Sequence, residues 1–133
     1  MVVRPKSVVL GERLSFLAII LLVVLAALGW GEAVAQYGAV ITIVANVIPI
    51  ALFLAATLIT TRGASFGGLI FLIVLTVFNL LGFLYQVSVG ALAEGVFGIL
   101  TAVQAAASLV AVVMLSRPNA RAWYRTMSEV SDA

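Results

Sequence analysis

The chain has 133 residues, of which 65% are hydrophobic and only 9% are charged, and its mean hydropathy is +1.30. A soluble domain carries about a quarter charged residues to cover its surface, so this composition excludes a soluble globule. There is room for about four apolar spans of roughly 20 residues each. Cysteine and histidine are both absent, which excludes disulfides and thiolate chemistry. We predict one domain over residues 1–133, an all-α integral membrane four-helix bundle.

The first 13 residues form a basic lead, and the first apolar span follows it at residues 14–30. We expect Pro5 and Gly11 to interrupt any regular helix in the lead, and the almost wholly aliphatic first span to be the most lipid-exposed of the four. A second interpretation stays open. The basic lead, the apolar run and the sequence Ala33-Val34-Ala35 match the three parts of a secretory signal peptide, and cleavage after Ala35 would leave three spans.

The three later spans are predicted at residues 38–61, 65–86 and 94–116. Pro49 lies inside the second span, where its missing backbone donor predicts a helix kink. The freed carbonyl near Ala45 would then need a partner, such as Thr42 or Asn46. In the third span the few polar residues recur every three or four positions, which predicts a face turned toward protein. In the fourth, the small residues Gly98, Ala102 and Ala106 predict close helix packing.

Residues 117–133 form a basic tail beyond the last span. Its apolar residues fall on one helical face and its arginines recur every four positions beside them, which predicts a short amphipathic interfacial helix. The expected interfacial anchors are Trp123, Tyr124, Arg117, Arg121 and Arg125.

The basic residues predict the orientation of the chain. They lie before the first span, between the second and third, and after the fourth, whereas the two other connections contain only Glu32 and Glu94 as charges. By the positive-inside rule both termini are expected in the cytoplasm, in the cytoplasmic membrane of a bacterial cell.

Three amides, Asn46, Asn79 and Gln104, are predicted at a similar depth in three different spans, with Thr76, Thr101 and Ser108 nearby. Because an unpaired amide in hydrocarbon costs several kcal/mol, these side chains should turn inward and form a polar layer. The layer is interpreted either as helix packing or as a pathway. With the spans bounded as above, no ionisable residue lies well inside one, which argues against a proton relay.

The sequence contains no metal-ligand cluster, no nucleophile with a base and no phosphate-binding glycine loop, so we expect neither an enzyme nor a cofactor, a metal or a nucleic-acid partner. Two hypotheses remain. One is an accessory or interaction subunit that binds another membrane protein or itself. The other is an oligomeric pore or small transporter. In size, apolar spans and basic tail the chain loosely resembles small bacteriophage holins, and it resembles many short four-span bacterial membrane proteins of unknown role.

Overall fold

The structure, a computed structural model, describes residues 3–90 and 95–132. Its helices are α1 (Lys6–Leu28), α2 (Trp30–Tyr37), α3 (Ala39–Thr61), α4 (Phe66–Ser88), α5 (Val96–Leu115) and α6 (Pro118–Asp132). Four of them, α1, α3, α4 and α5, are long and apolar enough to cross a membrane. The predicted fold class is therefore confirmed: the chain is a helical bundle with four candidate spans and a C-terminal helix, as expected of a small multi-pass membrane protein.

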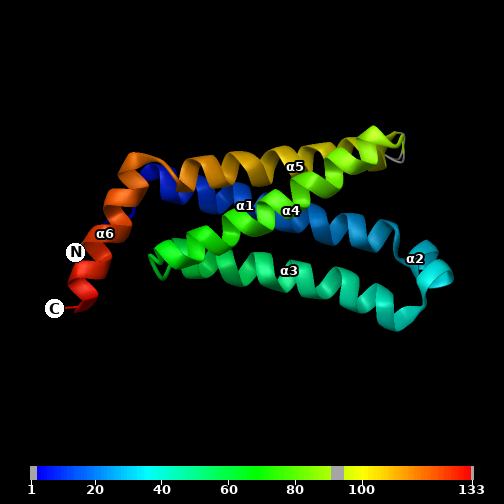
Figure 1. Ribbon diagram of the computed structural model, residues 1–133, viewed down its shortest axis with the longest axis horizontal. Helices are drawn as coiled ribbons and strands as arrows, with labels where there is room; N and C mark the ends of the chain where they lie inside the picture. The colour runs from blue at the N-terminus through cyan, green and yellow to red at the C-terminus, as the bar shows by residue number, and fades with distance from the viewer. Residues whose placement is uncertain (1–2, 91–94, 133) are drawn as a thin grey trace.

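The four long helices pack as a ring (Figure 1). The most extensive contact joins α1 to α5, and α3 pairs with α4; contacts of α1 with α3 and of α4 with α5 complete the ring. We call one end of this ring the basic end. It contains the start of α1, the connection from α3 to α4, and the end of α5 with α6 (Figure 1), and it carries all seven Lys and Arg residues.

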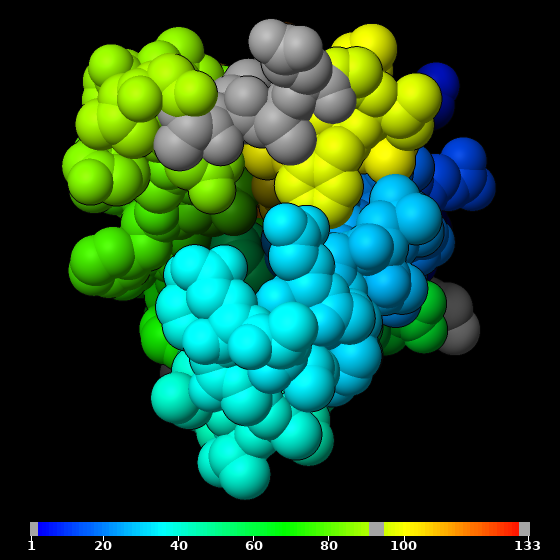
Figure 2. Space-filling view, turned by 90° about the vertical axis from the view of Figure 1, so that its right-hand side faces the viewer, coloured from blue at the N-terminus to red at the C-terminus, as the bar shows by residue number. Residues whose placement is uncertain are grey.

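The opposite end is formed by α2 and the neighbouring helix ends. The connection between the first two spans is itself helical: α2 ends at Tyr37, and its C-cap is Gly38, whose φ of 87° favours glycine. Figure 2 views this end and shows α2 and the start of α3 as a lobe standing off from α4 and α5. The described contacts of α2 are with α3 and, to a lesser extent, with α1.

The expectation that Pro5 and Gly11 interrupt the lead is wrong. Pro5 is the N-cap of α1, and Gly11 lies buried inside that helix. Proline is tolerated at a helix start because the first backbone N–H groups have no intrahelical acceptor there. The first helix therefore begins at Lys6 rather than at residue 14, and it takes two turns of the basic lead into the bundle.

At Gly11, α1 lies tightly against α5. A Cβ atom added to Gly11 would lie 2.7 Å from Cγ and Cδ2 of Leu115 and 3.2 Å from the carbonyl oxygen of Ala111. Close packing on this scale requires small residues at the interface. The first span is consequently not the most lipid-exposed of the four. In α1 and in α5, 33% of the helix's own apolar stretch is buried within the protein, whereas in α3 and in α4 the share is 17%.

The predicted packing edge of α5 is only partly in the interface. Gly98 is buried, Ala102 is half-buried and Ala106 is exposed. A four-residue step exceeds the 3.6-residue turn by about 40°, so a strict four-residue repeat drifts around the helix. The buried edge instead steps by four, three and four through Gln104, Ser108, Ala111 and Leu115. The other buried residues of α5 are Gly98, Ala105 and Ala107.

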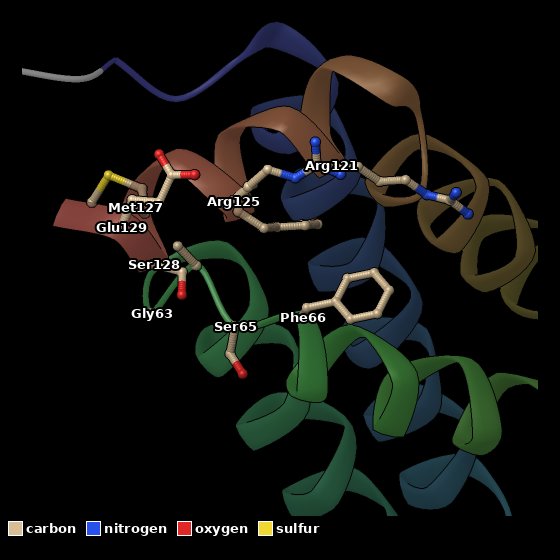
Figure 3. A pocket seen from close by; sticks show the side chains of 10 residues that line it. Gly63, Ser65, Phe66, Arg121, Arg125, Met127, Ser128 and Glu129 are labelled. Carbon is tan, nitrogen blue, oxygen red and sulfur yellow. The ribbon is translucent and has the colours of Figure 1, made fainter. Parts of the chain in front are cut away.

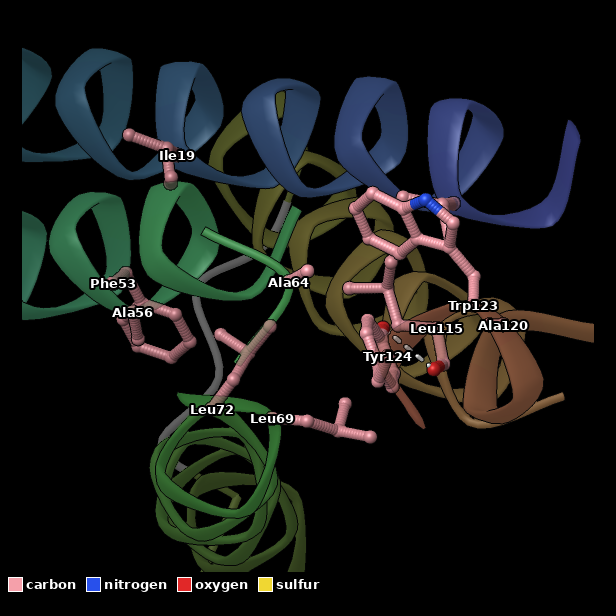
Figure 4. Close-up of a cluster of buried hydrophobic side chains, with 11 residues drawn as sticks. Ile19, Phe53, Ala56, Ala64, Leu69, Leu72, Leu115, Ala120, Trp123 and Tyr124 are labelled. Atoms are coloured by element: carbon pink, nitrogen blue, oxygen red, sulfur yellow. Dashed lines mark hydrogen bonds between the residues drawn. The ribbon is translucent and has the colours of Figure 1, made fainter. Parts of the chain in front are cut away.

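The last helix, α6, packs its apolar face onto the basic end. Ala120, Trp123 and Tyr124 are buried in one cluster with Val8 and Leu115 (Figure 4). The Tyr124 hydroxyl donates a hydrogen bond of 2.9 Å to the carbonyl oxygen of Leu115. The helix is amphipathic as predicted, but its two large aromatic side chains face protein, so they attach α6 to the bundle.

A substitution at Gly11 tests the α1–α5 contact. Gly11→Val should lower the free energy of unfolding in detergent by about 1–3 kcal/mol, because the new side chain overpacks against Leu115. The matched control is Gly31→Val in α2, where an added Cβ meets nothing within 4 Å; its effect should stay below about 0.5 kcal/mol. Equal effects of the two variants would contradict the close approach.

The Tyr124 phenol predicts an alkaline transition at the basic end. Burial raises its pKa from 10.0 to about 12. Because the folded state binds this proton more tightly than the unfolded state, the stabilisation is complete below pH 10 and is lost as the pH rises toward 12. A spectrophotometric titration at 295 nm should show a late phenolate signal near pH 12 that is missing in Tyr124→Phe. Identical titration curves would refute the burial of this hydroxyl.

Candidate functional site

Two of the three predicted amides meet between α4 and α5. Asn79 Nδ2 donates to Gln104 Oε1 at 3.1 Å and approaches Ser108 Oγ at 3.5 Å. Gln104 and Ser108 are buried and Asn79 is half-buried. The amide pair, as we call Asn79 and Gln104, therefore joins two neighbouring helices within the bundle.

The remaining polar residues of this region bond mainly within their own helices. The hydroxyls of Thr76, Thr101 and Ser108 donate to the carbonyl oxygens of Leu72, Phe97 and Ala105, each at 2.9 Å. Gln104 Nε2 is buried without a hydrogen-bond partner among the described residues. One donor of the amide pair is thus buried without an acceptor. Buried polar groups are rarely left without a partner, because each unpaired group costs free energy.

Asn46 does not join the amide pair, so the expected layer of three amides is not formed in the described structure. Its Nδ2 donates to the carbonyl oxygen of Thr42 in its own helix at 2.8 Å. The side chain lies in a groove of about 720 Å³ between α1 and α3, toward the end of the bundle opposite the basic end. The rest of the lining is apolar: Val23, Ala26, Ala27, Trp30, Val47, Ile50, Ala51 and Leu54. We call this the α1–α3 groove.

Pro49 lies within α3, which continues as an α-helix on both sides of it. The expected partners for the freed carbonyl near Ala45 are engaged elsewhere: Thr42 donates to Gly38 at 2.8 Å, and Asn46 to Thr42. Neither bonds to Ala45 among the hydrogen bonds that the structure describes.

Glu12 is a buried polar residue that the sequence pattern did not predict. The residue is only 5% exposed, and it lies in the second turn of α1 against the end of α3. Arg4 Nη1 lies 3.0 Å and Arg62 Nε 3.3 Å from Oε2, and the Thr61 hydroxyl also donates to Oε2. A buried carboxylate requires such partners, because an unpaired charge in apolar surroundings is very costly.

A second polar contact lies one turn further along the same interface. The hydroxyls of Ser15 and Thr57 are hydrogen-bonded at 2.6 Å. Together with Glu12 they tie α1 to α3 at the basic end, and we call this set the α1–α3 clamp. One signal in the sequence could have revealed it. Ser7, Gly11 and Ser15 follow one another at four-residue steps, and Glu12 lies three residues before Ser15. These small and polar residues therefore share one helical face.

The predicted anchors of the tail divide into two groups. Trp123 and Tyr124 are buried, whereas Arg117, Arg121 and Arg125 are exposed. The helix is also held through Asn119, whose Oδ1 accepts a hydrogen bond of 3.0 Å from the Ser7 hydroxyl. Of the two acidic residues expected in the far connections, Glu32 is exposed in α2 and Glu94 lies outside the described residues.

Comparisons with family models, with curated proteins and with solved structures yield no match for this chain. The candidate sites are therefore interpreted from their own geometry.

Replacing Glu12 tests the α1–α3 clamp. Glu12→Ala should destabilise the protein by about 2 kcal/mol, since it removes a hydrogen-bonded buried carboxylate and leaves a cavity. The loss of stability is limited because the Arg62 side chain is 62% exposed, so water can solvate its charge when the carboxylate is removed. Glu32→Ala is the control for an exposed carboxylate, with an effect below about 0.5 kcal/mol. The measurement is equilibrium unfolding in mixed micelles, and a null result for Glu12→Ala would mean that the clamp contributes nothing.

Proposed function

We propose that the protein is a non-enzymatic accessory subunit of a cytoplasmic membrane that binds one transmembrane helix of a larger membrane protein in the α1–α3 groove. The observation that carries the proposal is the position of Asn46. No described hydrogen bond reaches its Oδ1 atom, and the groove around it is otherwise apolar.

The chemistry of the groove favours a helix over a lipid chain. An amide oxygen in hydrocarbon is stabilised by a donor, and an acyl chain has none. A partner helix that carries a Ser, Thr, Asn or Gln side chain can donate to Asn46 while its apolar residues fill the groove. Interhelical hydrogen bonds of this kind contribute about 0.6 kcal/mol each, so most of the affinity would come from close packing.

The shape of the groove favours a different protein over a second copy. Two copies related by a two-fold axis would place two concave grooves face to face and leave a void between them. Placing the exposed face of α4 in the groove of a second copy would be a heterologous contact, which continues into rings or filaments. A single convex helix from a partner fills the groove without either consequence.

The orientation belongs to the same proposal. We propose that the basic end, and both termini with it, face the cytoplasm; the gathering of all seven basic residues at that end supports this by the positive-inside rule. An amide-lined pathway has less support, because Asn79 and Gln104 bond to each other and Asn46 lies in a separate groove.

Site-specific photocrosslinking in cells tests the proposal. A photoreactive residue at Ala51, in the groove wall, should give one discrete product with a partner, whereas the same residue at Val74, exposed on α4, should not. Asn46→Leu should reduce the Ala51 product roughly three- to twenty-fold. The matched control, Asn79→Leu, removes an amide outside the groove and should leave the product unchanged.

Two results would contradict the proposal. One is a product at twice the chain mass of 13.9 kDa, which would identify a homodimer. The other is equal labelling at Ala51 and Val74, which would mean that lipid fills the groove.

A further inference from the structure

A second cavity lies at the basic end, between α6 and the connection that leads into α4. Its volume is about 680 Å³, within the usual range for small-molecule sites. Residues 63–66 line one wall and the face of α6 from Arg121 to Glu129 lines the other (Figure 3). We call it the α4–α6 cavity.

Two arginines, Arg121 and Arg125, line the cavity. Among the described residues, ion pairs join Glu12 to Arg4 and to Arg62, and neither Arg121 nor Arg125 takes part in one. Glu129 also lines the cavity, and Figure 3 shows it at the end away from Phe66, while the arginine side chains extend toward the Phe66 end. The Phe66 end is therefore positively charged.

The first turn of α4 adds to this positive charge. Ser65 caps the helix by accepting a hydrogen bond of 3.0 Å from the Gly68 amide, and no described hydrogen bond uses the amides of Phe66 and Gly67. Free N–H groups at a helix start and the helix dipole both favour an anion. Guanidinium groups favour phosphate in particular, because they can donate two parallel hydrogen bonds to its oxygens.

The cavity opens onto an apolar surface that runs along a candidate span. Phe66 and Ile70 are 51% and 50% exposed, and Val74 and Val77 continue the same outer face of α4. A ligand with a phosphate at the arginines could thus lay hydrocarbon along α4. This combination of a charged cavity and an adjoining apolar stripe at the end of a span matches the chemistry of a phospholipid.

We propose that the α4–α6 cavity is a specific site for the phosphate headgroup of an anionic phospholipid from the surrounding leaflet. Arg121 and Arg125 bind the phosphate, the start of α4 adds its free amides, and the outer face of α4 takes an acyl chain. The site is independent of the α1–α3 groove, which lies toward the other end of the bundle.

Native mass spectrometry of the purified protein tests this site, with phosphatidylglycerol and phosphatidylcholine as probes. The wild type should retain one phosphatidylglycerol in preference to phosphatidylcholine. Arg121→Gln with Arg125→Gln should weaken phosphatidylglycerol binding about thirty-fold, the equivalent of about 1 kcal/mol for each lost cation. The charge-matched control is Arg13→Gln with Arg117→Gln, which removes two exposed arginines outside the cavity and should leave the affinity within about two-fold.

Three results would overturn the proposal. They are equal weakening in the two double variants, equal retention of the two lipids, and displacement of the lipid by millimolar glycerol phosphate, which would identify a soluble phosphate ester as the ligand. A photoreactive phosphatidylglycerol provides a test on the unaltered protein. It should label peptides that contain Phe66 to Ile70 and Arg121 to Glu129, and labelling confined to the far half of α4 would also overturn the site.

Discussion

The buried carboxylate of Glu12 constrains the whole basic end. A charged side chain on a residue only 5% exposed is tolerated only with partners. The partners of Glu12 come from three places: Arg4 before α1, Thr61 at the end of α3, and Arg62 after it. The start of α1 is thereby fixed against the end of α3. Because Gly11 also brings α1 close to α5, the first two turns of α1 are the point at which three helices are held together.

Toward the opposite end, the described residues of α1 and α3 show no comparable ion pair. The amide pair joins α4 to α5 within the bundle, and the α1–α3 groove lies between α1 and α3. A bundle that is fixed at one end and open at the other can keep its fold while one pair of helices receives a further element. The unused oxygen of Asn46 lies where such an element would contact both walls.

Composition and periodicity predicted the number of long helices, their approximate bounds and the amphipathic α6, because apolar length and helical spacing are local properties. The exceptions are informative. Pro5 and Gly11 have the local character of a helix break, but α5 supplies the close packing that makes glycine favourable at position 11. Glu12 is one charge in a basic lead, and local sequence does not show that its partners lie at the end of α3, about 50 residues later. Likewise, depth in the membrane grouped Asn46 with Asn79 and Gln104, whereas the rotation of each helix about its axis decides which amides meet.

The pairing of α1 with α5 has a consequence for biosynthesis. The main partner of the first helix emerges from the ribosome only after α2, α3 and α4, a delay on the order of ten seconds at ordinary elongation rates. Throughout that interval the face of α1 around Gly11 and Val8 has no partner from α5 or α6. Arg4, eight residues before Glu12, is already present to neutralise the carboxylate, so the nascent hairpin can enter the bilayer without an isolated charge.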